Sequence, residues 1–213
     1  MSELKTEDGY RFDLSGGHTA LDFANTVSRR GDPTGSVERL TDYGRLVSFA
    51  HQSGLISHAE AERLRSEAGA HPRAAAAALA RATELREAIY PVLSAEARGE
   101  PVPDAALAAL NAHLPEALGA LRIEPGGDGY RWMFDHGKTD LAPMLAPILR
   151  STAELLTSPA LARVRECDSD TCWWLFLDGS KSGTRRWCDM KICGNREKAR
   201  RHHKRHKAGE GSE

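Results

Sequence analysis

The chain lacks several features that mark common classes of protein. Its longest uninterrupted apolar runs, residues 74–80 and 173–177, are far shorter than the roughly 18 residues that cross a membrane as a helix. The N-terminal residues MSELKTEDGYRFDL contain no apolar stretch of the kind found in secretory signal peptides. We therefore expect no membrane partner and a cytoplasmic location.

Motifs of the common enzyme classes are also missing. The sequence contains no glycine-rich phosphate loop, no G-x-S-x-G and no H-E-x-x-H. Its four cysteines all belong to one cluster, so none is left over to act as a nucleophile. We therefore expect a protein that is not an enzyme.

A large net charge is the next missing feature, because the formal charge is only −1 at pH 7. The distribution is nevertheless uneven. Residues 181–207 hold eleven Lys or Arg against two acids, a net charge of +9, so the remainder of the chain carries −10. An acidic body with a basic end points to a nucleic acid or another anionic surface as the partner.

The cysteines are few, but they are grouped at Cys167, Cys172, Cys188 and Cys193. The spacing is C-x4-C, fifteen residues, and C-x4-C. Two close pairs separated by roughly 12 to 20 residues provide the four ligands of a tetrahedral structural zinc site, although two residues between ligands is the commoner spacing. The pattern predicts one structural Zn²⁺ held by these four thiolates.

Other chemistry for the four cysteines stays open at this point. Two disulfides would need an oxidising compartment, which the N-terminal sequence does not indicate. Sulfur ligands alone do not exclude iron or a redox site. The histidines of the basic end, His202, His203 and His206, are not expected as ligands, because four thiolates already complete a tetrahedron.

The residues around the cysteines predict a hairpin followed by a helix. Residues 173–177 read as a strand, 178–184 carry turn residues, and 185–187 are expected to return as a second strand. The tryptophans of this segment, Trp173, Trp174 and Trp187, are expected in its core rather than stacked on bases. After Cys193 the composition favours a basic helix with Asn195 as its N-cap, as in treble-clef-like zinc modules.

The basic helix is the predicted nucleic-acid interface. Asn195 and Arg196 are expected at base edges, because Asn pairs with adenine and Arg with guanine. Phosphate contacts are expected from Arg185, Arg186, Lys204, Arg205 and Lys207. The helix also presents Lys198, Arg200 and Arg201 to the nucleic acid. The competing interpretation is a solvated basic tail with no specific partner.

The first 158 residues predict a mainly helical domain with a small antiparallel β-sheet, an α+β fold. Ser57 and Glu60 have capping-box spacing, and an alanine-rich helix over about 73–97 should be kinked or divided at Pro91. Residues 121–124 and 130–134 indicate a hairpin with a loop longer than two residues. Residues 159–213 form the predicted finger, with a disordered tail at its end.

The heptapeptide Leu21–Val27 places Asp22, Asn25 and Thr26 among apolar residues. One interpretation is a ligand site built from these three side chains. The favoured interpretation is that Asp22 and Asn25 bond to nearby backbone, as short buried polar side chains usually do.

These motifs resemble two known domains. Cys193-Gly194-Asn195-Arg196, with the paired cysteines, Phe176-Leu177-Asp178 and Arg186-Trp187-Cys188, resembles the CGNR zinc finger. Leu21–Val27 looks like the opening signature of the ABATE domain, which precedes that finger in bacterial proteins described as stress-induced transcription regulators. Trp173 departs from the pattern, since a small residue is expected directly after the second cysteine.

The resemblance implies a DNA-binding transcription regulator whose finger binds DNA and whose N-terminal domain senses a ligand or dimerises, which allows a homodimer. Two alternatives stay open. The zinc module could bind RNA or a protein partner, or zinc–thiolate oxidation could release the helix as a redox switch.

Overall fold

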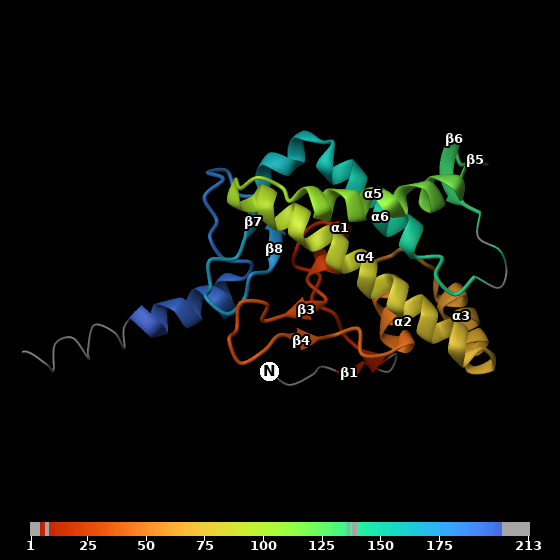
Figure 1. Cartoon of the computed structure of the whole chain (residues 1–213), viewed down its shortest axis with the longest axis horizontal. Helices are drawn as coiled ribbons and strands as arrows, with labels where there is room; N and C mark the ends of the chain where they lie inside the picture. The colour runs from red at the N-terminus through yellow and green to blue at the C-terminus, as the bar shows by residue number, and fades with distance from the viewer. Residues whose placement is uncertain (1–4, 7–8, 136, 138–139, 202–213) are drawn as a thin grey trace, which may run out of the picture.

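The computed structural model describes residues 5–6, 9–135, 137 and 140–201. Most of these residues are helical, and the strands pair as separate two-stranded antiparallel sheets (Figure 1). The predicted fold class, mainly α with small antiparallel sheets, is confirmed. Among the described residues, no helix combines the length and apolar character that crossing a membrane requires.

A long central helix, α4 (Pro72–Arg98), organises the body, and Figure 1 shows it crossing the molecule from one end to the other. Pro72 suits the first turn, where no backbone N–H is needed, and Gly99 ends the helix in a left-handed conformation with φ 66°. The sequence predicted a kink or a division at Pro91, and of these the division is excluded, because the helix continues through Pro91 without interruption. Burial of Ile89, Val92 and Leu93 around the proline explains how packing maintains the helix.

The other helices pack around α4 and bury one apolar core. Ser57 caps α3 by accepting a bond from the backbone N–H of Glu60, as the capping-box spacing predicts. Phe23 of the helix Thr19–Ala24 packs against Phe49 of the helix Tyr43–Gln52, with ring centroids 5.5 Å apart. The helices are α1 (Thr19–Ala24), α2 (Tyr43–Gln52), α3 (His58–Ala70), α5 (Asp104–Gly119) and α6 (Leu145–Leu156).

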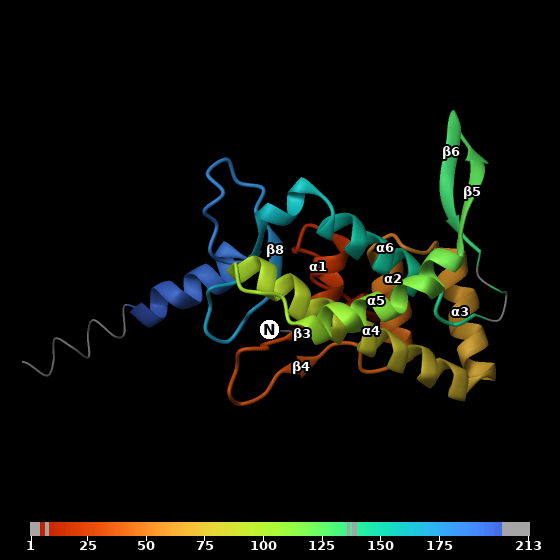
Figure 2. The ribbon, with the colours of Figure 1, turned by 45° about the horizontal axis from the view of Figure 1, so that its top comes forward.

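Short strands occupy the edges of the body. A hairpin of β5 and β6 stands out from the end opposite the finger, as Figure 2 shows. Its strands continue to Gly126 and Gly129, so the turn has two residues and the expected longer loop was wrong. The strands are β1 (Lys5–Thr6), β2 (Gly9–Tyr10), β3 (Val27–Ser28), β4 (Val37–Glu38), β5 (Leu121–Gly126), β6 (Gly129–Phe134), β7 (Val164–Glu166) and β8 (Leu175–Leu177).

The core of the body extends into the cysteine-containing segment. Val164 of β7 and Leu175 of β8 are fully buried and belong to the same apolar cluster as α1, α4 and α6. The next residue, Phe176, faces a second cluster that contains the four cysteines, with Trp174 and Trp187 packed against it. Alternate residues of β8 therefore face two different cores, which ties the cysteine segment to the body.

Candidate metal centre

The first cysteine pair lies on the turn that joins β7 to β8. The strands pair antiparallel with Val164 opposite Leu177 and Glu166 opposite Leu175. Beyond the ladder, the backbone N–H of Cys167 donates to Trp174 O at 2.8 Å, and that of Cys172 donates to Ser169 O at 2.9 Å. The tight turn therefore brings both thiols to one side of the hairpin. We call residues 167–173 the knuckle.

The second pair is positioned by two aspartates. Asp178 is fully buried, and its carboxylate accepts bonds from the backbone N–H groups of Ser180 and Arg185, both at 2.9 Å. Hydrogen bonds from Ser180 and Arg185 lower the pKa of Asp178 to about 2. Asp189 then caps a single π-helical turn, η2 (Met190–Gly194), which contains Cys193. The two carboxylates fold the loop so that Cys188 and Cys193 reach the knuckle.

The four sulfurs meet at the spacing of a metal site. All four Sγ atoms lie within 4.8 Å of one another, and the separations Cys172–Cys188 and Cys188–Cys193 are each 3.7 Å. A tetrahedral zinc with Zn–S bonds of about 2.3 Å places its sulfurs about 3.8 Å apart. The cysteines are buried and unpaired, so the donor set fits one Zn²⁺ and the disulfide alternative is not what the structure shows.

Without a bound cation, the four adjacent thiols cannot all be ionised. The proximity of the other three thiols lowers the pKa of Cys167 below its usual range, whereas the proximity of Cys167 raises the pKa of Cys172 and Cys188. A divalent cation supplies the positive charge that four thiolates need. Bound zinc would act here as a structural clamp between knuckle and loop.

Two local expectations about this segment were wrong. Residues 185–187 are not a strand, since β8 pairs with β7 instead. A backbone bond from Asp168 N to Arg186 O, at 2.9 Å, joins residues 185–187 to the knuckle. Asn195 is not the N-cap, because Asp189 accepts from Lys191 N and Ile192 N and the helical run starts at Met190. The metal ligand Cys193 thus lies inside the first turns, and α-helix follows over residues 195–201.

Several predicted nucleic-acid contacts are occupied by bonds within the protein. Arg185 donates to the carbonyls of Trp187 and Cys188 and lies over the Phe176 ring, 4.6 Å from its centroid. Arg200 forms ion pairs with Asp170 and Glu197. These two arginines hold the loop and the helix in place.

The remaining predicted contacts are more accessible. Arg186 bonds to Asp168 at 2.5 Å, but its side chain is 56% exposed. Arg196 donates to Thr171 Oγ1 at 3.3 Å, and Asn195 donates to Lys191 O at 3.0 Å. Lys198 and Arg201 are exposed. Lys204, Arg205 and Lys207 lie outside the described residues, as do His202, His203 and His206.

The Leu21–Val27 heptapeptide joins the body to the finger. Asn25 Nδ2 donates to Leu175 O at 2.8 Å, and Leu175 N donates back to Asn25 Oδ1 at 2.9 Å. Asp22 Oδ1 accepts from Gly16 N at 2.8 Å, and Thr26 Oγ1 donates to Phe23 O at 2.8 Å. Asp22 bonds to nearby backbone, as the favoured interpretation predicts, and Thr26 does so as well. Asn25 also bonds to backbone. The partner of Asn25, however, is 150 residues away.

The same three residues also line a cavity. It measures about 830 Å³, and its wall includes Asp22, Asn25 and Thr26 from the body together with Cys172, Cys188 and Cys193 from the metal centre. A side chain that hydrogen-bonds to backbone can also line a cavity, because its bonds use only part of its surface. This space lies between body and finger rather than inside the body.

Comparison with protein families covers almost the whole chain. The ABATE family model, described as "Putative stress-induced transcription regulator", matches residues 17–159. The chain belongs to the ABATE family. The model of the CGNR zinc finger matches residues 163–206, which hold all four cysteines. None of the curated proteins compared matches the chain. Both resemblances are confirmed, and the cofactor of the finger is one structural Zn²⁺.

Besides the Asn25–Leu175 bonds, the ABATE domain contacts the finger at Glu166, which the sequence did not suggest. Glu166, the residue before the first metal ligand, accepts bonds from Ser94 Oγ at 2.6 Å, Tyr90 Oη at 3.1 Å and Arg98 Nε at 2.9 Å. The three donors follow one another at intervals of four residues on α4, which places them on one side of the helix. That spacing was visible in the sequence, but its partner was not.

Trp173 explains why a small residue is expected after the second cysteine. Its backbone adopts φ 57°, a left-handed conformation that favours glycine. The ABATE domain compensates with contacts. The single O–H of Tyr90 is shared between Glu166 and Trp173 O, which lies 3.0 Å from Tyr90 Oη, Arg98 lies over the Trp173 ring, and that ring packs against Gly31. Trp174 and Trp187 join the metal-centre cluster as predicted, whereas Trp173 serves the contact between domains.

Proposed function

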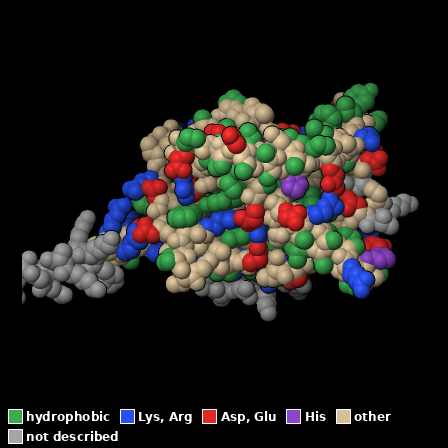
Figure 3. Space-filling model, in the orientation of Figure 1, with side chains coloured by type: hydrophobic (Ala, Val, Ile, Leu, Met, Phe, Trp, Pro, Cys, Tyr) green, Lys and Arg blue, Asp and Glu red, His purple; other side chains and the backbone are tan. Residues whose placement is uncertain are grey.

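We propose that the chain is a zinc-dependent DNA-binding transcription regulator in which the CGNR finger binds DNA and the ABATE domain senses a small molecule. The supporting observation is the basic helix that starts at the metal centre and projects away from the body (Figure 1). Blue side chains gather at that end in Figure 3. The role is non-catalytic, because four thiolates complete a tetrahedron and leave no position for a reactive water.

The ion pairs within the finger indicate which side of the helix is free to contact DNA. Lys191, Asn195 and Lys198 are exposed and spaced four and three residues apart, which places them on one side of the helical run. Lys191, Lys198 and Arg201 form no ion pair with any residue that the structure describes. The helix therefore presents unneutralised positive charge to solvent, which favours an anionic partner over a purely structural role.

The remaining basic residues divide into two groups. Arg185 and Arg200 act inside the finger, so their replacement weakens it indirectly. Arg196 and Arg186 retain unused N–H donors and exposed guanidinium groups. We assign base reading to Asn195 and Arg196 and phosphate contacts to Arg186, Lys191, Lys198 and Arg201, which leaves Lys204 and Arg205 as predictions.

The direct test is selection of bound sequences from a random duplex pool by the zinc-loaded chain, with zinc content measured in parallel. A titration of the selected duplex with salt should give a slope of log K against log salt near −4.5, if about five phosphates are neutralised. Lys198→Ala and Arg201→Ala should each make that slope shallower by about 0.9. Arg131→Ala, an exposed arginine on the hairpin at the opposite end, is the control and should leave it unchanged.

The outcomes separate DNA from other partners. Enrichment of no sequence, or tighter binding to structured RNA at the same salt concentration, would refute the proposed DNA-binding function and favour the RNA alternative. For base reading, Arg196→Ala should bind the selected and scrambled duplexes with more similar affinities than the unmodified chain does. An undiminished ratio between the two affinities would remove Arg196 from that role.

A redox switch is a less favoured mechanism for the same finger. All four cysteines are buried, which restricts the access of oxidants to their sulfurs. The switch requires that peroxide release both zinc and DNA. DNA binding that persists after peroxide has removed the zinc would exclude it.

Dimerisation is a second candidate role for the ABATE domain, and the β5–β6 hairpin supports it. Ile123 pairs with Trp132 and Pro125 with Tyr130, so one face of the hairpin is apolar. The side chains of Ile123, Tyr130 and Trp132 are 61%, 80% and 50% exposed. Light scattering should show a dimer that Trp132→Ser dissociates, whereas Arg122→Ser on the opposite face should not; a monomer at every concentration removes this role.

A further inference from the structure

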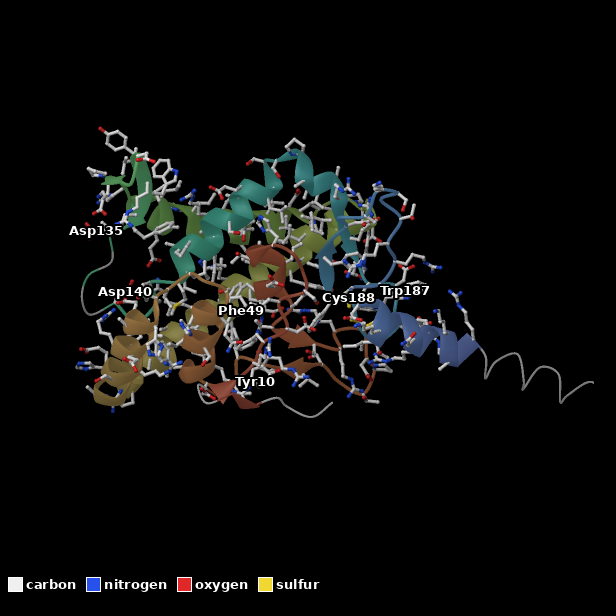
Figure 4. All side chains as sticks on the ribbon, turned by 180° about the vertical axis from the view of Figure 1, so that it is seen from behind. Tyr10, Phe49, Asp135, Asp140, Trp187 and Cys188 are labelled. Atoms are coloured by element: carbon white, nitrogen blue, oxygen red, sulfur yellow. The ribbon has the colours of Figure 1, made fainter. Side chains whose placement is uncertain are left out.

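The cavity between body and finger has the size and position of a ligand site. Its volume of about 830 Å³ lies within the range of small-molecule pockets. One wall comes from the N-terminal segment, with Tyr10 and Phe12, and the other from the finger, with Cys188 and Ile192. Tyr10 and Cys188 are labelled in Figure 4. A molecule held there would contact both domains.

The cavity offers an apolar surface for the body of a ligand. Phe12 is buried and packs edge-on against Tyr10, with ring centroids 4.9 Å apart. Leu14 and Trp174 continue this surface around the cavity. The Trp174 ring is held in place because its Nε1 donates to Val27 O at 3.1 Å. Aromatic side chains with fixed orientation suit a flat or aliphatic group of several carbons.

The cavity wall has hydrogen-bonding groups to spare among its described residues: the buried hydroxyl of Ser15 has no partner, and two arginines have N–H donors left. Arg39 is half-buried and donates through Nε to Ser28 Oγ at 3.1 Å, and it forms no ion pair with a described residue. Arg196 donates only to Thr171 Oγ1 among the described partners. Each guanidinium carries five N–H donors, so both have donors left. A carboxylate or similar anion satisfies such donors in pairs.

The acidic residues of the wall do not cancel these charges to the same extent. Asp13 accepts from Ser15 N, and Asp189 accepts from Lys191 N and Ile192 N, and both carboxylates keep their negative charge. The wall also holds four arginines, Arg11, Arg29, Arg39 and Arg196, which outnumber the acids. Asp22 is buried, which raises its pKa to about 7 despite the bond from Gly16 N. A large fraction of Asp22 is therefore neutral near pH 7. The balance favours an anionic ligand over a cationic one.

The position of the cavity connects the ligand to the metal. Cys172, Cys188 and Cys193 contribute to the wall, and Arg39 of the ABATE domain and Arg196 of the finger lie on the same space. An anion that contacts both arginines holds finger and body together. Where zinc leaves only after finger and body separate, a ligand that binds only the joined form slows zinc loss by the factor 1 + [L]/Kd.

We propose that this cavity binds a small organic anion with an apolar body, and that the bound anion retains zinc in the finger. The regulatory consequence rests on the proposed function: an anion that engages Arg196 competes with DNA for that side chain. The ABATE domain then senses the ligand at its contact with the finger, and no long-range conformational pathway is needed.

The test uses 2-naphthoate as the probe and the zinc-loaded full chain without DNA. Calorimetry should show one 2-naphthoate per chain, and the same-sized cation 2-naphthylmethylammonium should bind at least tenfold more weakly. Arg39→Gln keeps a hydrogen-bond donor near Ser28 but removes the charge, and should weaken 2-naphthoate at least tenfold. Zinc transfer to a colorimetric chelator should slow about tenfold when 2-naphthoate is present at ten times its Kd.

Matched variants make each outcome decisive. Arg73→Ala, an exposed arginine of α4 outside the cavity wall, should change neither 2-naphthoate affinity nor zinc transfer. If Arg39→Gln does not fold, Arg196→Gln tests the finger side of the same site. Equal affinity for the cation, an unchanged affinity in both glutamine variants, or a zinc transfer rate independent of 2-naphthoate overturns the inference. Failure to bind DNA with these results intact would refute the proposed function alone.

Discussion

The side chain of Asn25 hydrogen-bonds both backbone groups of Leu175, with distances of 2.8 Å to the carbonyl oxygen and 2.9 Å from the N–H. This is the pattern by which one strand residue pairs with another, made here by an amide side chain at the end of α1. Both residues are buried, at 3% and 0% exposure, so water cannot replace the bonds. Asn25 of the ABATE signature therefore extends the β7–β8 sheet and joins the finger to the body.

Asn25→Ala should destabilise the chain by about 3 kcal/mol, because it leaves two buried backbone groups without partners. Urea denaturation of the zinc-loaded protein measures the loss. Asn111→Ala, on the exposed side of α5, should change the free energy of unfolding by less than about 0.5 kcal/mol. Equal effects of the two substitutions would contradict the role of Asn25.

Removal of one zinc ligand should unfold the finger before the body. Cys193→Ser should lose zinc on dialysis against a chelator and lose hydrogen-exchange protection over residues 178–201, because zinc contributes on the order of 10 kcal/mol to such modules. Helices α2 and α3 lie at the far end of the molecule and should keep their protection (Figure 1). Ser182→Ala, in the same loop, is the control; full zinc content in Cys193→Ser would disprove the four-thiolate site.

Asp22 should make stability depend on pH. Burial raises its folded-state pKa to about 7 from 3.8, so between these values the folded state binds the proton more tightly than the unfolded state. The free energy of unfolding should then fall as pH rises from about 4 through 7. Asp22→Asn keeps an oxygen for the N–H of Gly16 and removes the charge, so it should be more stable than the unmodified chain at pH 8, by about 2 kcal/mol.

Denaturation of both proteins at pH 5 and pH 8 measures this difference. At pH 5 the gap should be smaller than at pH 8, because pH 5 is only slightly above the unfolded-state pKa of 3.8. A gap of the same size at both pH values would show that the raised pKa is not its cause.

Gly31 should be intolerant of a side chain because of the knuckle. A Cβ atom at this position would lie 2.5 Å from Nε1 of Trp173 and 2.6 Å from the backbone oxygen of Asp170. Gly31→Ala should therefore displace the knuckle and accelerate zinc transfer to a chelator severalfold. Gly69→Ala, inside α3 with no atom within 4 Å of the added Cβ, should stabilise the chain by up to about 1 kcal/mol. Zinc transfer at equal rates from the two variants would refute the contact.

Some features of this protein could be read from the sequence because they depend on neighbouring residues. Cysteine thiolates are metal ligands in any fold, and the spacing of these four in the sequence suits one zinc ion. Ser57 and Glu60 form a helix start within four residues, and the apolar faces of α2 and α6 follow from helical periodicity. The excess of positive charge near the C-terminus is a matter of counting.

Choices between partners distant in the chain required the tertiary structure. Residues 173–177 contain the strand β8, but only packing decides that Val164–Glu166, and not residues 185–187, pairs with it. Arg185 and Arg200 look like nucleic-acid contacts until the structure shows that carbonyls and carboxylates of the finger use them. The sequence by itself determined the four metal ligands, most of the helices and the charged end, because these arise from local chemistry. Only the tertiary structure decided which strand pairs with β8, that Asn25 holds Leu175 and that a cavity adjoins the zinc ligands, because these depend on groups up to 150 residues apart.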